Sequence, residues 1–166
     1  MSRAFVKEDT EDRLGEELPE RPVSDQPNYV THAGIVQLRE RVEALQAELA
    51  QIKQAGEALD RPRRSQVERD LRYYQSKLDG AIVVEVPAQP RDEVRFGARV
   101  EAQDEEGGRH RFTIVGEDEA DVAEGKVSWL SPLARALMGA KVGDTVTWQR
   151  PAGATGLEVL EIRYDK

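Results

Sequence analysis

Apolar residues recur between Ile35 and Ile52 at alternating steps of three and four positions. This spacing places their side chains in one narrow stripe along an α-helix, which is typical of a helix that packs against a second helix. Thr31 stands just before the stripe and is a suitable N-cap residue. We therefore predict a helix that begins after Thr31 and packs through these residues: Ile35, Leu38, Val42, Leu45, Leu49 and Ile52.

A second stripe with the same spacing follows Pro62, a residue that suits the first turn of a helix. Two such helices joined by a short polar turn predict an antiparallel coiled-coil hairpin over residues 31–80. Each arm would have about 20 to 25 residues and a length of roughly 30 to 37 Å. The stretch AGEALDRPRRS (55–65) would form the turn at the end of the hairpin. The second stripe consists of Val67, Leu71, Tyr74, Leu78 and Ala81.

After Gly80 the apolar period changes toward two, the period of β-strands. One run, SPLARALMGAKVGD, carries a helix signal instead, with Ser131 as N-cap, Pro132 in the first turn and Gly139 as the stop. Residues 81–166 are thus predicted to form a small, mostly antiparallel sheet domain with one short helix. The expected strands are 82–86, 94–101, 109–115, 126–129, 145–150 and 157–164, and the expected core is Val100, Phe112, Ile114, Val115, Trp148, Val159 and Ile162.

Residues 1–30 show neither period and contain three prolines among acidic residues. Such a stretch cannot bury enough apolar surface to offset the entropy lost on ordering. We predict a flexible acidic tail there. The whole chain is therefore expected to have an α+β fold in three parts: the tail 1–30, the hairpin 31–80 and the sheet domain 81–166.

Charge narrows the class of partner. The chain carries a net charge of −8, which argues against a protein that coats DNA through phosphate contacts. Residues 31–80 alone are net positive, with 9 basic and 8 acidic side chains, so a nucleic-acid contact is most plausible there. Cysteine is absent, which excludes disulfides and thiolate metal sites. No apolar run has the length of a membrane helix or a signal segment, so the cytoplasm is the expected location.

Motifs of a self-contained enzyme are missing. The sequence has no phosphate-binding glycine loop, no H-E-x-x-H zinc motif and no G-x-S-x-G nucleophile elbow. Its only histidines, His32 and His110, are expected on the surface, and zinc is not expected. We predict that the protein is not itself an enzyme and has no cofactor of its own.

Several motifs in the C-terminal half occur in a specific order. They are FGARV (96–100), RFTIVGEDEAD (111–121), SPLARAL (131–137), KVGDTV (141–146), RPAG (150–153) and LEIRY (160–164). In this order they resemble the Gre transcript-cleavage factors, the GreA/GreB type of bacterial transcription elongation factor. The resemblance covers about residues 31–166 and is strongest from Phe96 onward.

The resemblance implies both a fold and a partner. Family members have an N-terminal antiparallel coiled coil and a C-terminal domain with an FKBP-like sheet. By this resemblance the globular domain would dock on the rim of the secondary channel of RNA polymerase, while the hairpin enters the channel as part of a monomeric factor. The residues expected to bind the polymerase are Leu130, Ser131, Pro132 and Arg135.

The same resemblance implies chemistry at the end of the hairpin. Glu57 and Asp60 would help to hold the second Mg²⁺ of the polymerase active site, because a hard cation prefers carboxylate oxygens. The polymerase would then hydrolyse the backtracked RNA 3′ end. The factor would supply metal ligands to the polymerase and would contact the nascent RNA only indirectly.

Three departures from the family pattern leave alternatives open. The arms look shorter by about two turns, which would withdraw the tip by roughly 12 Å. The order of the acids, Glu57 then Asp60, is the reverse of the family's Asp then Glu, and Leu130 replaces the usual Asp or Asn. The neighbouring arginines would neutralise these acids or meet RNA phosphates or acidic channel walls: Arg61, Arg63 and Arg64.

Three functions remain to be compared. The first is a factor that stimulates transcript cleavage, and the second is a channel-binding regulator without cleavage activity, like the short-hairpin regulators of nucleoside diphosphate kinase. In that second case Glu57 and Asp60 only solvate the turn and pair with the arginines. The third is a peptidyl-prolyl isomerase or chaperone, which an aromatic content of 5% disfavours because such a site needs an aromatic-lined pocket.

Overall fold

The structure, a computed structural model, describes residues 18–56, 61–85 and 90–164. Their contacts divide the chain into two units. One unit, called here the hairpin unit, contains residues 18–27 and 36–80. The other, called the globular unit, contains residues 28–35 together with the described residues from 81 onward.

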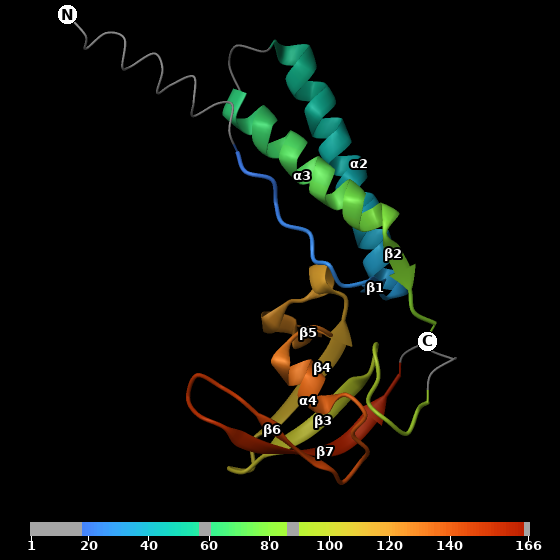
Figure 1. Ribbon diagram of the computed structural model, residues 1–166, viewed down its shortest axis with the longest axis vertical. Helices are drawn as coiled ribbons and strands as arrows, with labels where there is room; N and C mark the ends of the chain where they lie inside the picture. Colours follow the sequence, from blue (N-terminus) through green and yellow to red (C-terminus); the bar gives the residue numbers. More distant parts are fainter. Residues whose placement is uncertain (1–17, 57–60, 86–89, 165–166) are drawn as a thin grey trace, which may run out of the picture. The chain divides into compact units, whose positions relative to one another are not determined.

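Helix α2 (His32–Ala55) and helix α3 (Arg61–Asp79) lie side by side and run in opposite directions (Figure 1). The predicted N-cap is confirmed, since the amide of Gly34 donates to the Thr31 hydroxyl at 3.0 Å. The 24 residues of α2 correspond to about 36 Å, and the 19 residues of α3 make that arm slightly shorter than expected.

The interface between the two helices follows the predicted seam. Leu38, Val42, Leu45 and Val67 are buried, and Leu49, Ile52, Leu71, Tyr74 and Leu78 are half-buried. Lys77 is also buried, at 3% exposure, although it lies outside the apolar stripe. A single row of apolar contacts therefore holds the hairpin, with little core around it.

A five-stranded sheet forms the centre of the globular unit, in the order β5-β4-β3-β7-β6. The pairs β3/β4, β3/β7 and β6/β7 are antiparallel and β4/β5 is parallel, so the prediction of a mostly antiparallel sheet is confirmed. The strands are β3 (Arg99–Asp104), β4 (Arg109–Val115), β5 (Lys126–Ser128), β6 (Thr145–Trp148) and β7 (Thr155–Arg163).

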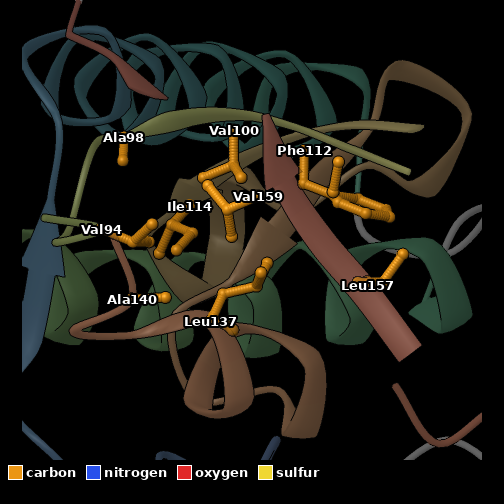
Figure 2. Close-up of a cluster of buried hydrophobic side chains, with 11 residues drawn as sticks. Val94, Ala98, Val100, Phe112, Ile114, Leu137, Ala140, Leu157 and Val159 are labelled. Carbon is orange, nitrogen blue, oxygen red and sulfur yellow. The ribbon is translucent and has the colours of Figure 1, made fainter. Parts of the chain in front are cut away.

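One face of this sheet carries the hydrophobic core, which Figure 2 shows in close-up. Helix α4 (Pro132–Leu137) adds Ala134 and Leu137 to it. Five of the predicted core residues are buried, while Trp148 and Ile162 are only partly buried against them. The sequence pattern missed Val94, Ala98 and Ala140, which are buried although they lie in no strand or helix.

Several expected boundaries differ from the structure; for example, β6 ends at Trp148 and not at residue 150. Two of the differences change the architecture. The strand predicted over 94–101 begins only at Arg99, because the chain turns before it and the amide of Ala98 donates to the Arg95 carbonyl at 3.0 Å. The predicted tail extended through residue 30, but β1 (Asn28–Val30) pairs in parallel with β2 (Ala81–Val83). Residues 1–17 lie outside the described residues.

Tyr29 explains why β1 is ordered. Its ring lies 5.0 Å from the ring of Trp129 and 6.3 Å from that of Phe96, measured between centroids. Val30 is 3% exposed, and its carbonyl accepts from the amide of Val84 at 3.0 Å. These contacts join residues that are about fifty or more positions apart, so no local pattern could indicate them.

Candidate functional site

The four residues expected to bind a partner come together at the start of α4. Strand β5 ends at Ser128, whose hydroxyl accepts from the amide of Leu130 at 3.2 Å. The carbonyl of Ser128 accepts from the amide of Ser131 at 2.9 Å. The Ser131 hydroxyl then caps α4 by accepting from the amide of Ala134 at 3.2 Å. A tight turn followed by a capped helix thus fixes the position of this segment.

Helix α4 has one buried and one exposed side. Ala134 and Leu137 point into the core, whereas Pro132 and Arg135 are exposed and, three positions apart, share a helix face. Leu130 and Ser131 are half-buried beside them. This exposed face, defined here as the α4 surface (Leu130, Ser131, Pro132 and Arg135), suits contact with another protein.

An exposed valine near β5 escaped the sequence analysis. Val122, in the short 3₁₀ helix η3 (Val122–Glu124), is 92% exposed, the highest value among large hydrophobic side chains of the described residues. An isolated valine between acidic residues creates no apolar period. Only its exposure in the fold identifies it as a candidate contact residue.

At the end of the hairpin, Glu57 and Asp60 lie outside the described residues, so their roles stay predictions. The three arginines expected near them form the first turn of α3. Arg63 donates to Glu48 of α2, with Nε and Oε1 2.6 Å apart, and Arg64 Nε lies 3.0 Å from Glu68 Oε1. Arg61 is exposed. Two of these arginines therefore bind acids of the helices themselves.

Residues 18–27, called here the N-terminal segment, lie alongside α3 (Figure 1). The Arg72 guanidinium donates to both carboxylate oxygens of Glu20, with Nε–O distances of 3.0 and 3.1 Å. These hydrogen bonds hold the pKa of Glu20 below its usual value. Arg21 binds Asp70 at 3.3 Å and lies 3.9 Å above the ring centroid of Tyr73. No local sequence pattern indicates this attachment, because its partners are 49 and 52 positions apart.

A carboxylate also attaches the first turn of α2 within the globular unit. Glu119, the last residue of η2 (Glu117–Glu119), accepts hydrogen bonds from the amide and the hydroxyl of Thr31 and from the amide of Gly116. Gly34 lies directly against this carboxylate, since a Cβ at Gly34 would be 2.3 Å from Glu119 Cδ. Glu119 belongs to the motif GEDEAD, but its partner is 88 positions away.

The histidines differ from each other. His32 is exposed as predicted, with its side chain 70% accessible. The prediction of a surface position is wrong for His110, which is half-buried, stacks on Phe112 and lies 2.8 Å from Asp104 Oδ2. The hydrogen bond from His110 lowers the pKa of Asp104. Among the described residues, no group of three His, Asp or Glu side chains could hold a metal ion.

Among the described helices, none combines the length with the apolar character that a membrane-spanning segment requires.

Comparisons with known proteins identify relatives of this chain. Residues 89–164 match the family model of the C-terminal part of the transcription elongation factors GreA and GreB. The chain is 33% identical to the transcription elongation factor GreA of Nitratidesulfovibrio vulgaris over 166 residues, which cover 99% of this chain and 98% of that protein. It is 34% identical to GreB of Neisseria meningitidis over 155 residues, which cover 84% of this chain and 95% of GreB.

Solved structures give a weaker likeness. The GreA/GreB factor from Nitrosomonas europaea aligns with 84% of this chain at 23% identity and a TM-score of 0.42, over 100% of its own length.

A helical hairpin joined to an antiparallel-rich sheet domain is thus found in a chain with full-length relatives among transcription elongation factors. The chain belongs to the GreA/GreB family.

Proposed function

We propose that this protein binds RNA polymerase at its secondary channel. The globular domain, FKBP-like as in the family, docks on the channel rim and the hairpin enters the channel. The observation that carries the proposal is the α4 surface, where a capped turn presents Pro132 and Arg135 to solvent beside Leu130 and Ser131. The exposed Val122 adds an apolar contact residue. The protein acts as a monomer in the cytoplasm.

The hairpin supplies the second half of the proposal. Glu57 and Asp60 would contribute carboxylate oxygens to Mg²⁺ at the polymerase active site, an ion that takes oxygen ligands and acidifies its bound water. The polymerase itself performs the hydrolysis of the backtracked RNA. Arg61, the exposed arginine at the start of α3, is the candidate for contact with RNA phosphates or an acidic channel wall.

A regulator that occupies the channel without stimulating cleavage is the second candidate. The reversed order of Glu57 and Asp60 favours it, as does the 19-residue length of α3. The binding of Arg63 and Arg64 to acids of the helices leaves fewer cations near the tip for RNA. Both candidates use the α4 surface and differ only at the tip.

A cleavage assay with purified RNA polymerase in stalled, backtracked complexes distinguishes the cleavage factor from the regulator without cleavage activity. With Mg²⁺, a cleavage factor should release short RNA fragments from the 3′ end, and the double variant Glu57→Ala, Asp60→Ala should slow this release at least about tenfold, as expected for lost metal ligands. Binding of the same variant to polymerase should be unchanged. Normal cleavage by the variant would assign the chemistry to other residues.

Docking through the α4 surface is tested separately, by measuring the binding of variants to RNA polymerase without a cleavage assay. Pro132→Ser with Arg135→Glu changes the exposed residues of α4 and keeps its buried side intact. We expect at least about tenfold weaker binding to core polymerase. The matched control Arg91→Glu with Pro90→Ser changes the same residue types elsewhere on the globular unit. Equal loss in both variants, or loss in neither, would contradict docking through the α4 surface.

A further inference from the structure

The sheet of the globular unit has a second face, opposite its core, that carries mostly charged side chains. Val100, Phe112 and Val159 face the core, and the alternation of strand residues turns their neighbours outward. These outward residues of β3, β4 and β7 are exposed or half-buried: Arg99, Glu101, Gln103, Arg109, Arg111, Thr113, Glu158, Glu161 and Arg163.

The strand register brings like charges together on this face. Arg99 lies directly opposite Arg163, and Glu101 lies directly opposite Glu161, across the β3/β7 pair. Like charges at facing positions of antiparallel strands are destabilising. The fold keeps two such pairs side by side, although Glu101 also faces the opposite charge of Arg111 across the β3/β4 pair.

A hollow of about 150 Å³ lies among these side chains. Its lining consists of Arg99, Glu101, Arg111, Glu161 and Arg163. Arg163 Nε lies 2.7 Å from Glu161, and Arg109, on the neighbouring strand, lies 3.6 Å from Glu101. Three arginines thus line the hollow with two glutamates, and the whole face carries four arginines against three glutamates, an excess of one positive charge on a chain whose net charge is −8.

We propose that these four arginines form a binding surface for an acidic segment of a protein partner. This surface, the arginine patch, is defined as Arg99, Arg109, Arg111 and Arg163. An aspartate or glutamate of the partner enters the hollow between Arg99, Arg111 and Arg163, where guanidinium groups can bind its carboxylate in the bidentate geometry. The partner's charge offsets the repulsion between Arg99 and Arg163.

The two glutamates favour a protein over a nucleic acid. Consecutive phosphates along a strand would meet Glu101 and Glu161 within the patch and be repelled. A protein segment avoids this repulsion because neutral or basic residues can flank its acidic one. The mixture of charges therefore selects a partner with one or two carboxylates beside cationic side chains.

The arginine patch is distinct from the α4 surface. Helix α4 packs on the core face of the sheet through Ala134 and Leu137, whereas the patch lies on the opposite face. A partner could thus bind the patch whether or not α4 is occupied. The proposal does not depend on polymerase docking, and the two can fail separately.

Nuclear magnetic resonance titration of the ¹⁵N-labelled protein tests the proposal. The probe is a short peptide with a central Asp-Glu pair between lysines, and its matched control has Asn-Gln in place of the pair. We expect saturable shifts at the amides and Nε–H groups of Arg99, Arg111 and Arg163 with the acidic peptide alone. The double variant Arg99→Glu, Arg163→Glu should bind at least about tenfold more weakly.

Two controls separate binding from general electrostatics and from folding. The variant Arg39→Glu, Arg91→Glu has the same net charge as the patch variant and should bind normally. Arg99→Gln with Arg163→Gln removes the repulsion together with the exposed Arg163–Glu161 ion pair, which contributes little to stability, so it should lose the peptide without a lower melting temperature. The proposal is overturned by absent shifts at millimolar peptide, by equal loss in the Arg39, Arg91 variant, or by tighter binding of an oligothymidylate than of the peptide.

Discussion

The hairpin unit and the globular unit bury their apolar residues in different ways. In the globular unit, a sheet face and α4 enclose eleven buried residues in one cluster. In the hairpin, two helices share a single seam with four buried apolar residues from α2 and α3: Leu38, Val42, Leu45 and Val67. A cluster enclosed on several sides resists rearrangement, whereas a seam between two helices can close by a small shift.

The difference extends to polar contacts. In the hairpin unit, exposed ion pairs add to the apolar seam. One of them is Glu20–Arg72, whose side chains are 63% and 57% accessible. The globular unit also has exposed ion pairs, but it adds hydrogen bonds that are partly buried, as between Glu119 and Thr31. Exposed pairs are weakened by water and salt, and buried ones are costly to lose. The two regions should therefore respond differently to the same kind of mutation.

The largest effect is expected from a cavity in the enclosed core. Ile114→Ala should lower the free energy of unfolding of the globular unit by about 3 to 5 kcal/mol, because the surrounding sheet and helix cannot collapse into the space. Ile114 is 0% exposed. Trp129 and Trp148, the two tryptophans of the chain, lie in this unit. Tryptophan fluorescence in a urea titration therefore measures the change.

A matched deletion in the hairpin provides the control. Leu45, 1% exposed, is as buried as Ile114. Leu45→Ala should cost about 2 kcal/mol, at the low end for such deletions, because α2 and α3 can approach each other. Far-ultraviolet circular dichroism in a urea titration, a signal dominated by these helices, measures this loss of stability. Equal shifts of both signals in both variants would show one cooperative unit and contradict the comparison.

The next effect concerns the attachment of α2 by Glu119. Gly34→Ala would improve helix propensity by about 0.5 to 1 kcal/mol, but its Cβ displaces the Glu119 carboxylate and breaks hydrogen bonds to Thr31. Because lost charge-assisted bonds outweigh that gain, we expect a net destabilisation of about 1 kcal/mol. Tryptophan fluorescence in urea again measures it.

A double variant makes this prediction sharper. In a Glu119→Ala background the carboxylate is absent, so Gly34→Ala should become stabilising by about 0.5 to 1 kcal/mol. A reversal of sign supports the geometry at Gly34. The same sign in both backgrounds would mean that Glu119 does not determine the cost of a side chain at this position.

These contacts also show what the sequence can predict. The seam of α2 and the strands β4 and β7 follow from periods within about twenty residues, which bring like residues to one face. The Ser131 cap and Pro132 are local signals as well. The attachments by Glu119 and Glu20 join residues 88 and 52 positions apart, and no period connects them. Tyr29 was assigned to a tail because a three-residue strand carries almost no pattern of its own.

In the candidate site, too, the features encoded within a few residues could be predicted, and the contacts between distant residues could not. The position of the α4 surface was predictable, since turn and cap are encoded within a few residues. The partners of Arg63 and Arg64 were not, because helix sequence alone does not say which acid an arginine will reach. The arginine patch was also missed, since strand register decides that Arg99 faces Arg163.

The smallest effect is expected from the N-terminal segment, and it should depend on pH and salt. Arg21→Ala removes the contact with Tyr73 and the ion pair with Asp70, which together should cost about 0.5 to 1 kcal/mol of attachment. Hydrogen exchange of the amides of residues 20–27, at neutral pH and low salt, should become faster while the fluorescence transition of the globular unit stays unchanged. Glu20→Gln should have a similar local effect, because the charge bound by Arg72 is lost.

The pH dependence follows from the lowered pKa of Glu20, whose usual value is 4.5. A carboxyl group with a depressed pKa contributes its stabilisation above the usual value and loses it as the pH falls through the lowered one. The wild-type segment should therefore detach as the pH decreases below about 4.5, or as salt rises to molar concentration, where screening acts over about 3 Å. Glu20→Gln should lack the acid-dependent step at this site. An unchanged acid-dependent step in Glu20→Gln would assign the attachment to another carboxylate, such as Asp70 beside Arg21, rather than to the pair with Arg72.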